Sequence, residues 1–432
     1  MQLLIKGGNS PHGYVDIGAA KNAVLPIIAA CTMSSHTIVL HNISPFGDVL
    51  EMLSILRHLG CIADIHGDTI TINCKSLNSY RVNEIDARKL RASICLLGPL
   101  STRSDIVDVS LPGGCNIGSR PIDIHIDGFK KLGFTVEQNE SVILKSNGFY
   151  STNSNCPLTS HDHSSNPTTI KLDMPSVGAT QNLVMAACGI DSTTTILNAA
   201  QEPEVVDLIN FINAIGGKIS GAGTSTIVIE GKLKSISDIE YTPIGDRVVA
   251  GTYLLTAALG LGGDVTTKGV DPMHMQHFLK IMQEMGAEVS TGTDYVRLKS
   301  KGRLKSFSTI KTRPYPGFAT DMQAQLVTAL TLANGKSTVY ENLFENRFGH
   351  VPQLASMGAD INIIQNTLQI NGVDRLHPSN LHATDLRCGA SMVLAALSSK
   401  GTSTVDGVDY INRGYYKIWD DLNQLGLDVR LI

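Results

Sequence analysis

The chain has 432 residues, of which 42% are hydrophobic and 17% are charged. A soluble domain typically has about 25% charged residues, so the low value indicates extensive burial, and the hydrophobic fraction excludes disorder for most of the chain. The net charge of −4 argues against a nucleic-acid-binding protein, which normally has a strongly basic face. Anionic small substrates are not excluded, because a few clustered cations suffice to bind them.

The N-terminal residues 1–8 lack the pattern of a signal peptide and predict a first strand. No apolar run approaches about 18 residues, so we expect no transmembrane helix and no membrane partner. None of the eight cysteines belongs to a CxxC pair, which argues against a zinc ribbon or a thioredoxin-like site. Several lie in apolar runs that are typical of inert thiols, so we expect a reduced, cytoplasmic protein.

One pattern recurs six times: an amphipathic helix, a hydrophobic residue followed by glycine, an alternating strand, a polar turn and a second strand. Each glycine is expected to end its helix as a C-cap. The last copy lacks its second strand, which the N-terminal strand could supply. The six glycines are Gly60, Gly133, Gly216, Gly286, Gly358 and Gly426.

A second helix, made of small and apolar residues, precedes each copy. These helices have almost no polar face, so we expect them to be buried on all sides. A kink is expected at Pro26 in the first. Two domains of three units fit better than a solenoid, which would need polar capping repeats, and the polar segment 151–168 predicts a surface insertion. The predicted helices span 22–31, 92–100, 179–188, 251–259, 322–330 and 388–397.

The sparse charges concentrate at the N-terminal ends of these buried helices, where free N–H groups and the helix dipole attract anions. Asp321 and Ser176 could be ordinary caps, but a basic residue there opposes the dipole. If the helix ends converge, they form an anion-binding cleft. The residues are Lys21, Arg91, Ser176, Val177, Gly178, Arg247, Asp321, Asp385 and Arg387.

The segment 111–121 differs from every other repeat, because its three glycines and two prolines predict a long loop. Cys115 is the only reactive side chain in this loop, and Arg120 lies five residues further on. An exposed thiol near cations is expected to be nucleophilic or acidic, although an incidental loop cysteine is the alternative. Arg120 could hold an anion, and Asp123 could accept hydrogen bonds from a sugar or a base.

With these motifs the chain resembles the UDP-N-acetylglucosamine 1-carboxyvinyltransferase family of enolpyruvyl transferases over its whole length. The motifs that carry the resemblance include Ala20-Lys21-Asn22-Ala23, Leu90-Arg91-Ala92-Ser93, Pro112-Gly113-Gly114-Cys115, Ser119-Arg120-Pro121-Ile122-Asp123, Pro175-Ser176-Val177-Gly178, Thr320-Asp321-Met322-Gln323, Phe344-Glu345-Asn346-Arg347, Ala383-Thr384-Asp385-Leu386-Arg387 and Arg413-Gly414-Tyr415.

The resemblance implies a two-domain inside-out α/β barrel of six βαβαββ units, three per domain, with helices inside and sheets outside. It implies domains at 21–245, carrying the Cys115 loop, and at 1–20 plus 246–432, with the active site in the cleft between them. The implied reaction transfers the enolpyruvyl group of phosphoenolpyruvate to the 3′-hydroxyl of UDP-N-acetylglucosamine and releases phosphate. This is the first committed step of peptidoglycan synthesis, which needs no metal or organic cofactor and is blocked by the epoxide fosfomycin.

The resemblance also implies residue roles. Cys115 would protonate C3 of phosphoenolpyruvate, Asp321 would accept the hydroxyl proton, and fixed cations, among them Lys21 and Arg413, would stabilise the developing charge. Phosphoenolpyruvate would bind Lys21, Asn22, Arg120 and Arg413. The nucleotide sugar would bind Arg91, Arg120, Pro121, Ile122, Asp123, Ile124, Ser176, Val177, Gly178, Asp321 and Leu343, and the supporting residues would be Arg347, Asp385 and Arg387.

The sequence departs from the family pattern at Asn412, Tyr416, Val249 and Met174-Pro175. These departures leave open a paralogous enolpyruvyl transferase with a different nucleotide or sugar acceptor. A catalytically silent binding protein with the same fold is the alternative from another class, and retention of Cys115 with the cations argues against it. His161-Asp162-His163 is interpreted as exposed loop, and no metal site is expected. The sequence does not indicate an oligomeric state.

Overall fold

The computed structural model describes residues 1–113, 118, 122–146, 167–234 and 237–432. These residues form two compact units. The C-terminal unit comprises 1–20, 118 and 244–432, and the N-terminal unit comprises 21–113, 122–146, 167–234 and 237–243. Within the described part of the chain, no helix is long and apolar enough to cross a membrane.

Each unit contains three four-stranded sheets, and all six sheets share one strand order. The first two strands of each sheet are parallel, and the other two pairings are antiparallel. In the N-terminal unit the sheets are β14 (Ile239–Tyr241), β3 (Thr37–Leu40), β5 (Thr69–Asn73) and β4 (Ile62–His66); β6 (Arg81–Val82), β7 (Ile106–Ser110), β9 (Ser141–Lys145) and β8 (Thr135–Gln138); and β10 (Thr168–Lys171), β11 (Thr193–Leu197), β13 (Thr226–Glu230) and β12 (Lys218–Ser220). In the C-terminal unit they are β2 (His12–Asp16), β15 (Gly263–Lys268), β17 (Tyr295–Ser300) and β16 (Glu288–Thr291); β18 (Thr309–Lys311), β19 (Lys336–Tyr340), β21 (Thr367–Asn371) and β20 (Asp360–Ile364); and β22 (Asn380–His382), β23 (Gly401–Asp406), β1 (Gln2–Gly7) and β24 (Asp428–Leu431).

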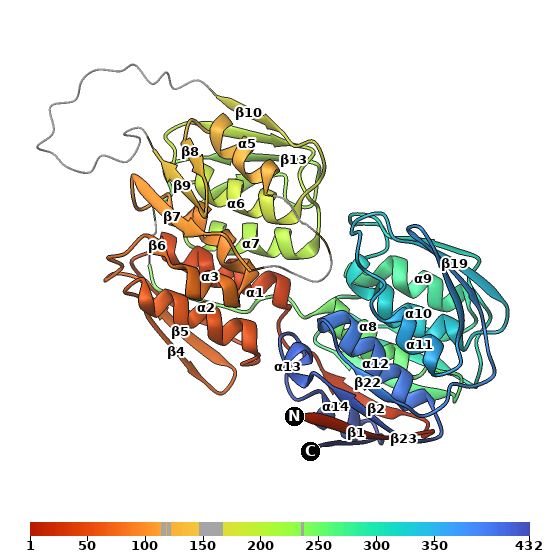
Figure 1. The fold of residues 1–432 in the computed structure, drawn as a ribbon. Coiled ribbons are helices and arrows are strands. Elements are labelled where there is room, and N and C mark those ends of the chain that lie inside the picture. The colour runs from red at the N-terminus through yellow and green to blue at the C-terminus, as the bar shows by residue number, and fades with distance from the viewer. Residues whose placement is uncertain (114–117, 119–121, 147–166, 235–236) are drawn as a thin grey trace, which may run out of the picture. The chain divides into compact units, whose positions relative to one another are not determined.

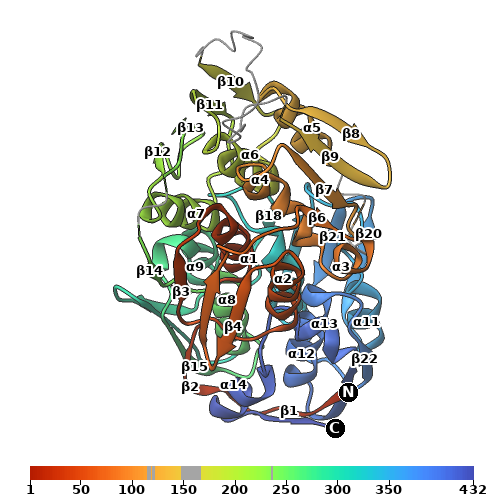
Figure 2. The same cartoon turned by 90° about the vertical axis from the view of Figure 1, so that its left-hand side faces the viewer.

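The N-terminal strand completes the sixth sheet, as the sequence predicted. β1 pairs with β23 on one side and with β24 on the other, so that Leu4 faces Thr404 and Arg430. The backbone N–H of Gln2 donates to the carbonyl of Ile432 at 3.0 Å, and the two chain ends lie side by side (Figure 1). In the N-terminal unit a strand from a distant part of the chain also completes a sheet, because β14 pairs in parallel with β3 as an edge strand (Figure 2).

The helices of small and apolar residues form the interior of each unit, which confirms their predicted burial. In the C-terminal unit α8, α10 and α12 pack against one another inside the sheets (Figure 1). The second helix differs from the prediction, because residues 91–96 form a 3₁₀ helix before a short α-helix. The inner helices are α1 (Lys21–Ala30), η2 (Arg91–Leu96) with α4 (Leu97–Leu100), α6 (Val177–Ala187), α8 (Arg247–Thr256), η4 (Thr320–Met322) with α10 (Gln323–Thr331), and α12 (Leu386–Ser398).

The amphipathic helices end as predicted. Each is followed by a glycine with a positive φ, between 77° at Gly426 and 107° at Gly216, which glycine adopts without steric cost. The chain then enters the next strand. These helices are α2 (Gly47–His58), α5 (Asp123–Lys131), α7 (Pro203–Ala214), α9 (Gln276–Glu284), α11 (Val351–Ser356) and α14 (Ile418–Gln424), and the remaining short ones are η1 (Cys31–Met33), α3 (Glu84–Lys89), η3 (Pro272–Met275) and α13 (Val408–Ile411).

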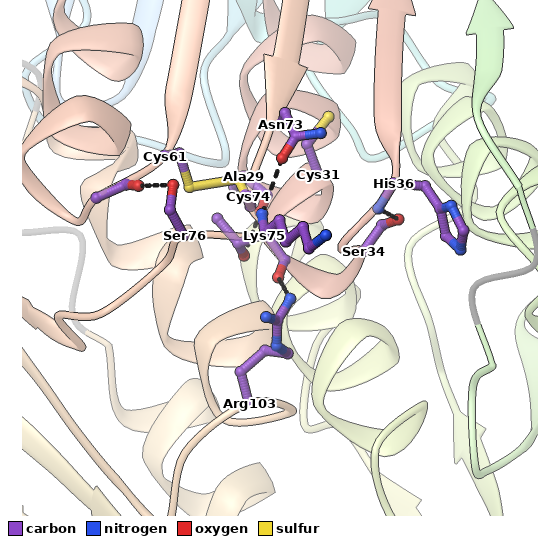
Figure 3. The surroundings of a disulfide bond; sticks show 12 residues. Ala29, Cys31, Ser34, His36, Cys61, Asn73, Cys74, Lys75, Ser76 and Arg103 are labelled. Carbon is purple, nitrogen blue, oxygen red and sulfur yellow. Dashed lines mark hydrogen bonds between the residues drawn. A yellow bond between two sulfur atoms is a disulfide. The ribbon is translucent and has the colours of Figure 1, made fainter.

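The expectation that all cysteines are reduced is wrong at one pair. Cys61 and Cys74 form a disulfide at the open end of the β4–β5 hairpin (Figure 3). The hairpin register pairs Ile62 with Asn73, so the two cysteines are the next facing pair, with their Cα atoms 4.4 Å apart. That distance lies within the range of disulfides. The cysteines at 31, 95, 188 and 388 are buried thiols outside this disulfide, and the first three lie in the apolar runs that predicted inert thiols.

Candidate functional site

Asp321 lies between two buried arginines at the N-terminal end of the helix pair η4 and α10. One carboxylate oxygen accepts a hydrogen bond from Arg347, and the other accepts one from Arg387 at 2.6 Å. The two arginine side chains are 5% and 6% exposed, whereas the Asp321 side chain is 27% exposed. The carboxylate is therefore oriented by its two partners and is still open to solvent on one side.

Arg387 is held as a cation by its surroundings. Burial has the largest single effect and lowers the pKa of the Arg387 guanidinium, but the charges of Asp321, Tyr415 and Asp246 and the hydrogen bond to Asp321 together raise that pKa above its ordinary value. Asp385 caps α12 by accepting hydrogen bonds from the backbone N–H groups of Arg387 and Cys388 at 2.8 and 3.1 Å. The predicted supporting residues Arg347, Asp385 and Arg387 thus belong to one cluster with Asp321.

A neutral histidine completes this cluster. His350 is 1% exposed, and burial followed by the charge of Arg347 lowers its pKa to about 3. The imidazole therefore carries no charge at neutral pH. The sequence analysis did not single out His350, and its place beside Arg347 depends on the local fold of residues 347–351.

A buried network of neutral groups supports the backbone of Asp321. The Gln325 side-chain amide donates to the Asp321 carbonyl at 3.0 Å and reaches the hydroxyls of Thr252 and Tyr415 at 3.3 Å each. Those two hydroxyls lie 2.8 Å apart. Through Tyr415 the network joins the segment of the half-buried Arg413 to the helix of Asp321. Gln325 was not predicted from the sequence, although a glutamine in a helix predicted to be buried was a visible signal.

In the N-terminal unit, Lys21 opens α1 and pairs with an acid that the sequence analysis missed. Its Nζ lies 2.6 Å from Asp48 in the first turn of α2, and both side chains are largely buried. Asn22 follows it, and the Asn22 carbonyl accepts a long hydrogen bond of 3.5 Å from Gln181. Arg91 is half-buried at the first position of η2.

α5 and α6 meet at His125 in the first turn of α5 and at Asn182 in the second turn of α6. The His125 Nδ1 accepts from the Asn182 amide at 2.9 Å, and the same amide donates to the carbonyl of Ile94 at 3.0 Å. The Asn182 oxygen accepts from the Gly98 backbone N–H at 2.9 Å. One fully buried asparagine therefore joins α6, α5, η2 and α4. A polar residue in a helix predicted to be buried was again the available signal.

The predicted Ser176-Val177-Gly178 motif forms the half-buried N-terminus of α6. Ser176 caps the helix by accepting from the Ala179 backbone N–H at 3.4 Å. A side chain at Gly178 would approach the His125 ring to 3.3 Å, so the backbone there lies close to the imidazole. The free N–H groups of such a turn suit an anion.

The structure describes only some of the other predicted residues. Ile122 is buried at the N-cap of α5, Asp123 is exposed and Ile124 is half-buried. Leu343 is half-buried after β19. Cys115, Arg120 and Pro121 lie outside the described residues, as does nearly all of the segment 151–168.

The described residues thus offer an oriented carboxylate with two guanidiniums in one unit and helix N-termini with Lys21 in the other. This set can bind anions and accept a proton from a hydroxyl. No group of three or more potential metal ligands occurs among the residues that the structure describes.

Comparison with known proteins identifies the family. Residues 5–422 match the family described as EPSP synthase (3-phosphoshikimate 1-carboxyvinyltransferase). The chain is 40% identical over 425 residues to the UDP-N-acetylglucosamine 1-carboxyvinyltransferase 2 of Caldanaerobacter subterraneus subsp. tengcongensis, with 98% of each chain covered. It is 42% identical over 429 residues to the UDP-N-acetylglucosamine 1-carboxyvinyltransferase of Shewanella frigidimarina, with 99% of each covered.

Solved structures show the same fold. The enolpyruvyl transferase NikO from Streptomyces tendae matches 99% of this chain and 98% of its own, with a TM-score of 0.85 and 24% identity. An EPSP synthase from Acinetobacter baumannii matches 99% of both chains with a TM-score of 0.73 and 16% identity. The fold is therefore the two-domain inside-out α/β barrel that the sequence predicted. With its full-length match to the family model and to these relatives, the chain belongs to the EPSP synthase family and, within it, to the UDP-N-acetylglucosamine 1-carboxyvinyltransferases.

Proposed function

We propose that this protein transfers the enolpyruvyl group of phosphoenolpyruvate to the 3′-hydroxyl of UDP-N-acetylglucosamine and releases phosphate. Relatives about 40% identical over nearly the whole chain carry the corresponding name. Within the structure, the observation that carries the proposal is Asp321 held between Arg347 and Arg387. A carboxylate oriented in this way can take a proton from a sugar hydroxyl while neighbouring cations face a phosphate.

The proposed chemistry needs three proton transfers. Protonation of C3 of phosphoenolpyruvate makes C2 electrophilic, and the sugar oxygen then forms a bond to C2 as its proton passes to Asp321. Loss of the C3 proton and cleavage of the C2–O bond to phosphate give the enolpyruvyl ether and inorganic phosphate. Cys115 is proposed as the acid that protonates C3.

The remaining residues are proposed to bind the two substrates. Lys21, Asn22, Arg120 and Arg413 would hold phosphoenolpyruvate. The nucleotide sugar would contact Arg91, Arg120–Ile124, Ser176–Gly178, Asp321 and Leu343. The free N–H groups at the start of α6 and the half-buried Arg91 support this assignment, since both suit a diphosphate.

We also propose that the units act as the two catalytic domains, at 21–245 and at 1–20 plus 246–432, with the substrates bound between them. The protein is proposed to work in the cytoplasm, where its two phosphorylated substrates are made. The free thiols at Cys31, Cys95, Cys188 and Cys388 support a reducing compartment, whereas the Cys61–Cys74 disulfide counts against it.

A paralogous activity with another acceptor is the second candidate. Met174-Pro175 stands where some relatives have a lysine-containing pair, and Met174 is 46% exposed two residues before the Ser176 cap. A missing cation at this point alters the surroundings of a bound nucleotide sugar, and it therefore favours a different nucleotide or sugar acceptor.

The test measures inorganic phosphate released from phosphoenolpyruvate with UDP-N-acetylglucosamine, with UDP-glucose and with no acceptor. The proposal predicts release that depends on UDP-N-acetylglucosamine, together with an enolpyruvyl ether of this sugar detected by mass spectrometry. Release with UDP-glucose alone would favour the paralogous activity, and no release with either would refute the enolpyruvyl transfer proposed here.

A further inference from the structure

Glu341 is a buried carboxylate that the proposed chemistry does not use. It directly follows β19 and is 2% exposed. Its side chain accepts four hydrogen bonds, so both oxygens are occupied. Among the described residues no lysine or arginine pairs with it. Hydrogen bonds therefore stabilise this buried charge, which is costly unless its partners are well placed.

The partners of Glu341 belong to two segments that carry candidate acceptor contacts. Oε2 accepts from the Thr320 hydroxyl at 2.8 Å, and Thr320 precedes Asp321 in η4. Oε1 accepts from the backbone N–H groups of Leu343 and Phe344 at 2.9 and 3.3 Å. One carboxylate thus ties the backbone beside Asp321 to the backbone of Leu343.

A third element anchors the carboxylate itself. Oε1 also accepts from the Thr312 hydroxyl at 2.9 Å, and that hydroxyl accepts from the Asn342 backbone N–H at 2.9 Å. Thr312 follows β18, whose parallel pairing with β19 fixes its position. The link between the two segments is therefore attached to the sheet.

We propose that Glu341 is a positioning residue that sets the spacing between Asp321 and Leu343 and thereby the affinity for the acceptor sugar. The inference rests on the proposed function, because it takes both residues as acceptor contacts. Glu341 acts through its hydrogen-bond partners and does not itself touch the substrate. Its loss should therefore weaken use of the acceptor more than use of phosphoenolpyruvate.

Three substitutions weaken the hydrogen bonds of Glu341 to different extents. Thr320→Val removes only the bond to Oε2, and a lost hydrogen bond to a charged group should raise the acceptor KM about tenfold. Glu341→Ala removes all four bonds and should raise it about a hundredfold. Glu341→Gln keeps a carbonyl oxygen for the N–H groups and should fall between them, while the phosphoenolpyruvate KM changes less than about twofold in Thr320→Val and Glu341→Gln.

Thr194→Val is the matched control. Thr194 is a fully buried threonine of β11 whose hydroxyl has no hydrogen-bond partner, so this substitution keeps the shape and removes no bond. Both KM values should match those of the wild type. Thermal unfolding of every variant establishes that the kinetic measurements are made on folded protein.

The outcomes separate the two proposals. If the wild type is active but Thr320→Val and Glu341→Gln leave the acceptor KM unchanged, or raise both KM values equally, only the role of Glu341 is overturned. A wild type that releases no phosphate with UDP-N-acetylglucosamine would overturn the proposed function, and the role of Glu341 with it.

Discussion

In the C-terminal unit the candidate residues pair charge with charge, since the Asp321 carboxylate lies between the guanidiniums of Arg347 and Arg387. In the N-terminal unit, α5 and α6 are joined by neutral groups, with the Asn182 amide bonded to His125 and to two backbone sites. Charge pairs can stabilise charge that develops in a reaction, whereas fixed neutral groups orient helix ends that bind an anion. We therefore propose that Asp321 with its two arginines acts mainly on the chemical step and that the contacts between α5 and α6 act mainly on binding, while the N-terminal unit also contains one buried charge pair, Lys21 with Asp48.

The largest expected effect comes from Asp321→Asn, which keeps the shape of the side chain and removes the base. We expect kcat to fall about 1000-fold, because a positioned general base typically contributes a factor of that order. Asp264→Asn is the matched control, because Asp264 pairs with Arg297 at 2.6 Å on the surface. Steady-state phosphate release should be unchanged in this control, and an equal loss in both variants would contradict the role of Asp321.

The next effect concerns stability in the N-terminal unit. Asn182→Ala removes three hydrogen bonds from a fully buried site, and we expect the free energy of unfolding of this unit to fall by about 3 kcal/mol. Circular dichroism should show that the N-terminal unit of the variant unfolds before the C-terminal unit. The fluorescence of Trp419 should not show this first transition, because the only tryptophan of the sequence lies in α14 of the C-terminal unit.

Asn213→Ala is the control for that variant. Asn213 makes two backbone hydrogen bonds at the end of α7, so its substitution should lower the free energy of unfolding by about 1–2 kcal/mol, less than Asn182→Ala does. A Trp419 transition that moves together with the circular dichroism of Asn182→Ala would show that the two units do not unfold separately.

The disulfide should stabilise the N-terminal unit to a similar extent. A cross-link that closes a loop of this size, with its cysteines 13 residues apart, contributes about 3 kcal/mol by restricting the unfolded chain. A non-reducing digest should yield linked peptides that contain Cys61 and Cys74, and Cys61→Ala with Cys74→Ala should lower the circular-dichroism midpoint. Unlinked peptides from protein purified without reductant would contradict the pairing.

The smallest effect is the pH dependence that His350 gives to the C-terminal unit. Its pKa is lowered to about 3 in the folded chain and is about 6.5 when unfolded, so the unfolded state binds more protons between these values. Stability should therefore be complete above pH 6.5 and fall as the pH falls towards 3, with about 2 kcal/mol lost at pH 5.

His350→Gln should remove this part of the pH dependence, as measured by urea unfolding followed with Trp419. Burial raises the pKa of Asp421 to about 6, so that carboxyl makes stability fall as the pH rises from about 4 to about 6. Because both proteins contain Asp421, its contribution cancels in their difference. Identical pH profiles would show that His350 is not held neutral by burial.

Local sequence patterns predicted most of the fold. The glycines that end the amphipathic helices and the strand that closes the sixth sheet were both predicted, because each depends on residues near one another in the chain or on a repeat. The disulfide was missed because the search used CxxC spacing, whereas Cys61 and Cys74 meet through the hairpin register.

The charged residues of the site were predicted, but the residues that hold them in place were not. Asp321, Arg347 and Arg387 were all candidates, and the structure brings them together. Glu341 was not, because its link to Thr312 and Thr320 depends on how separate segments meet. Asn182 was not, because its partners lie in other elements, such as Gly98, which is 84 residues away. Contacts of that kind depend on how three helices pack, and no pattern along a single helix encodes them.

The contrast between the units is tested most directly by kcat and the acceptor KM of Asp321→Asn and Ser176→Ala, measured side by side. Ser176 caps α6 in the N-terminal unit, and its loss should raise the acceptor KM about tenfold while kcat stays within about twofold. Asp321→Asn should lower kcat about 1000-fold. A lowered kcat in Ser176→Ala with an unchanged acceptor KM, or an Asp321→Asn variant that alters only KM, would contradict the division between chemistry and binding.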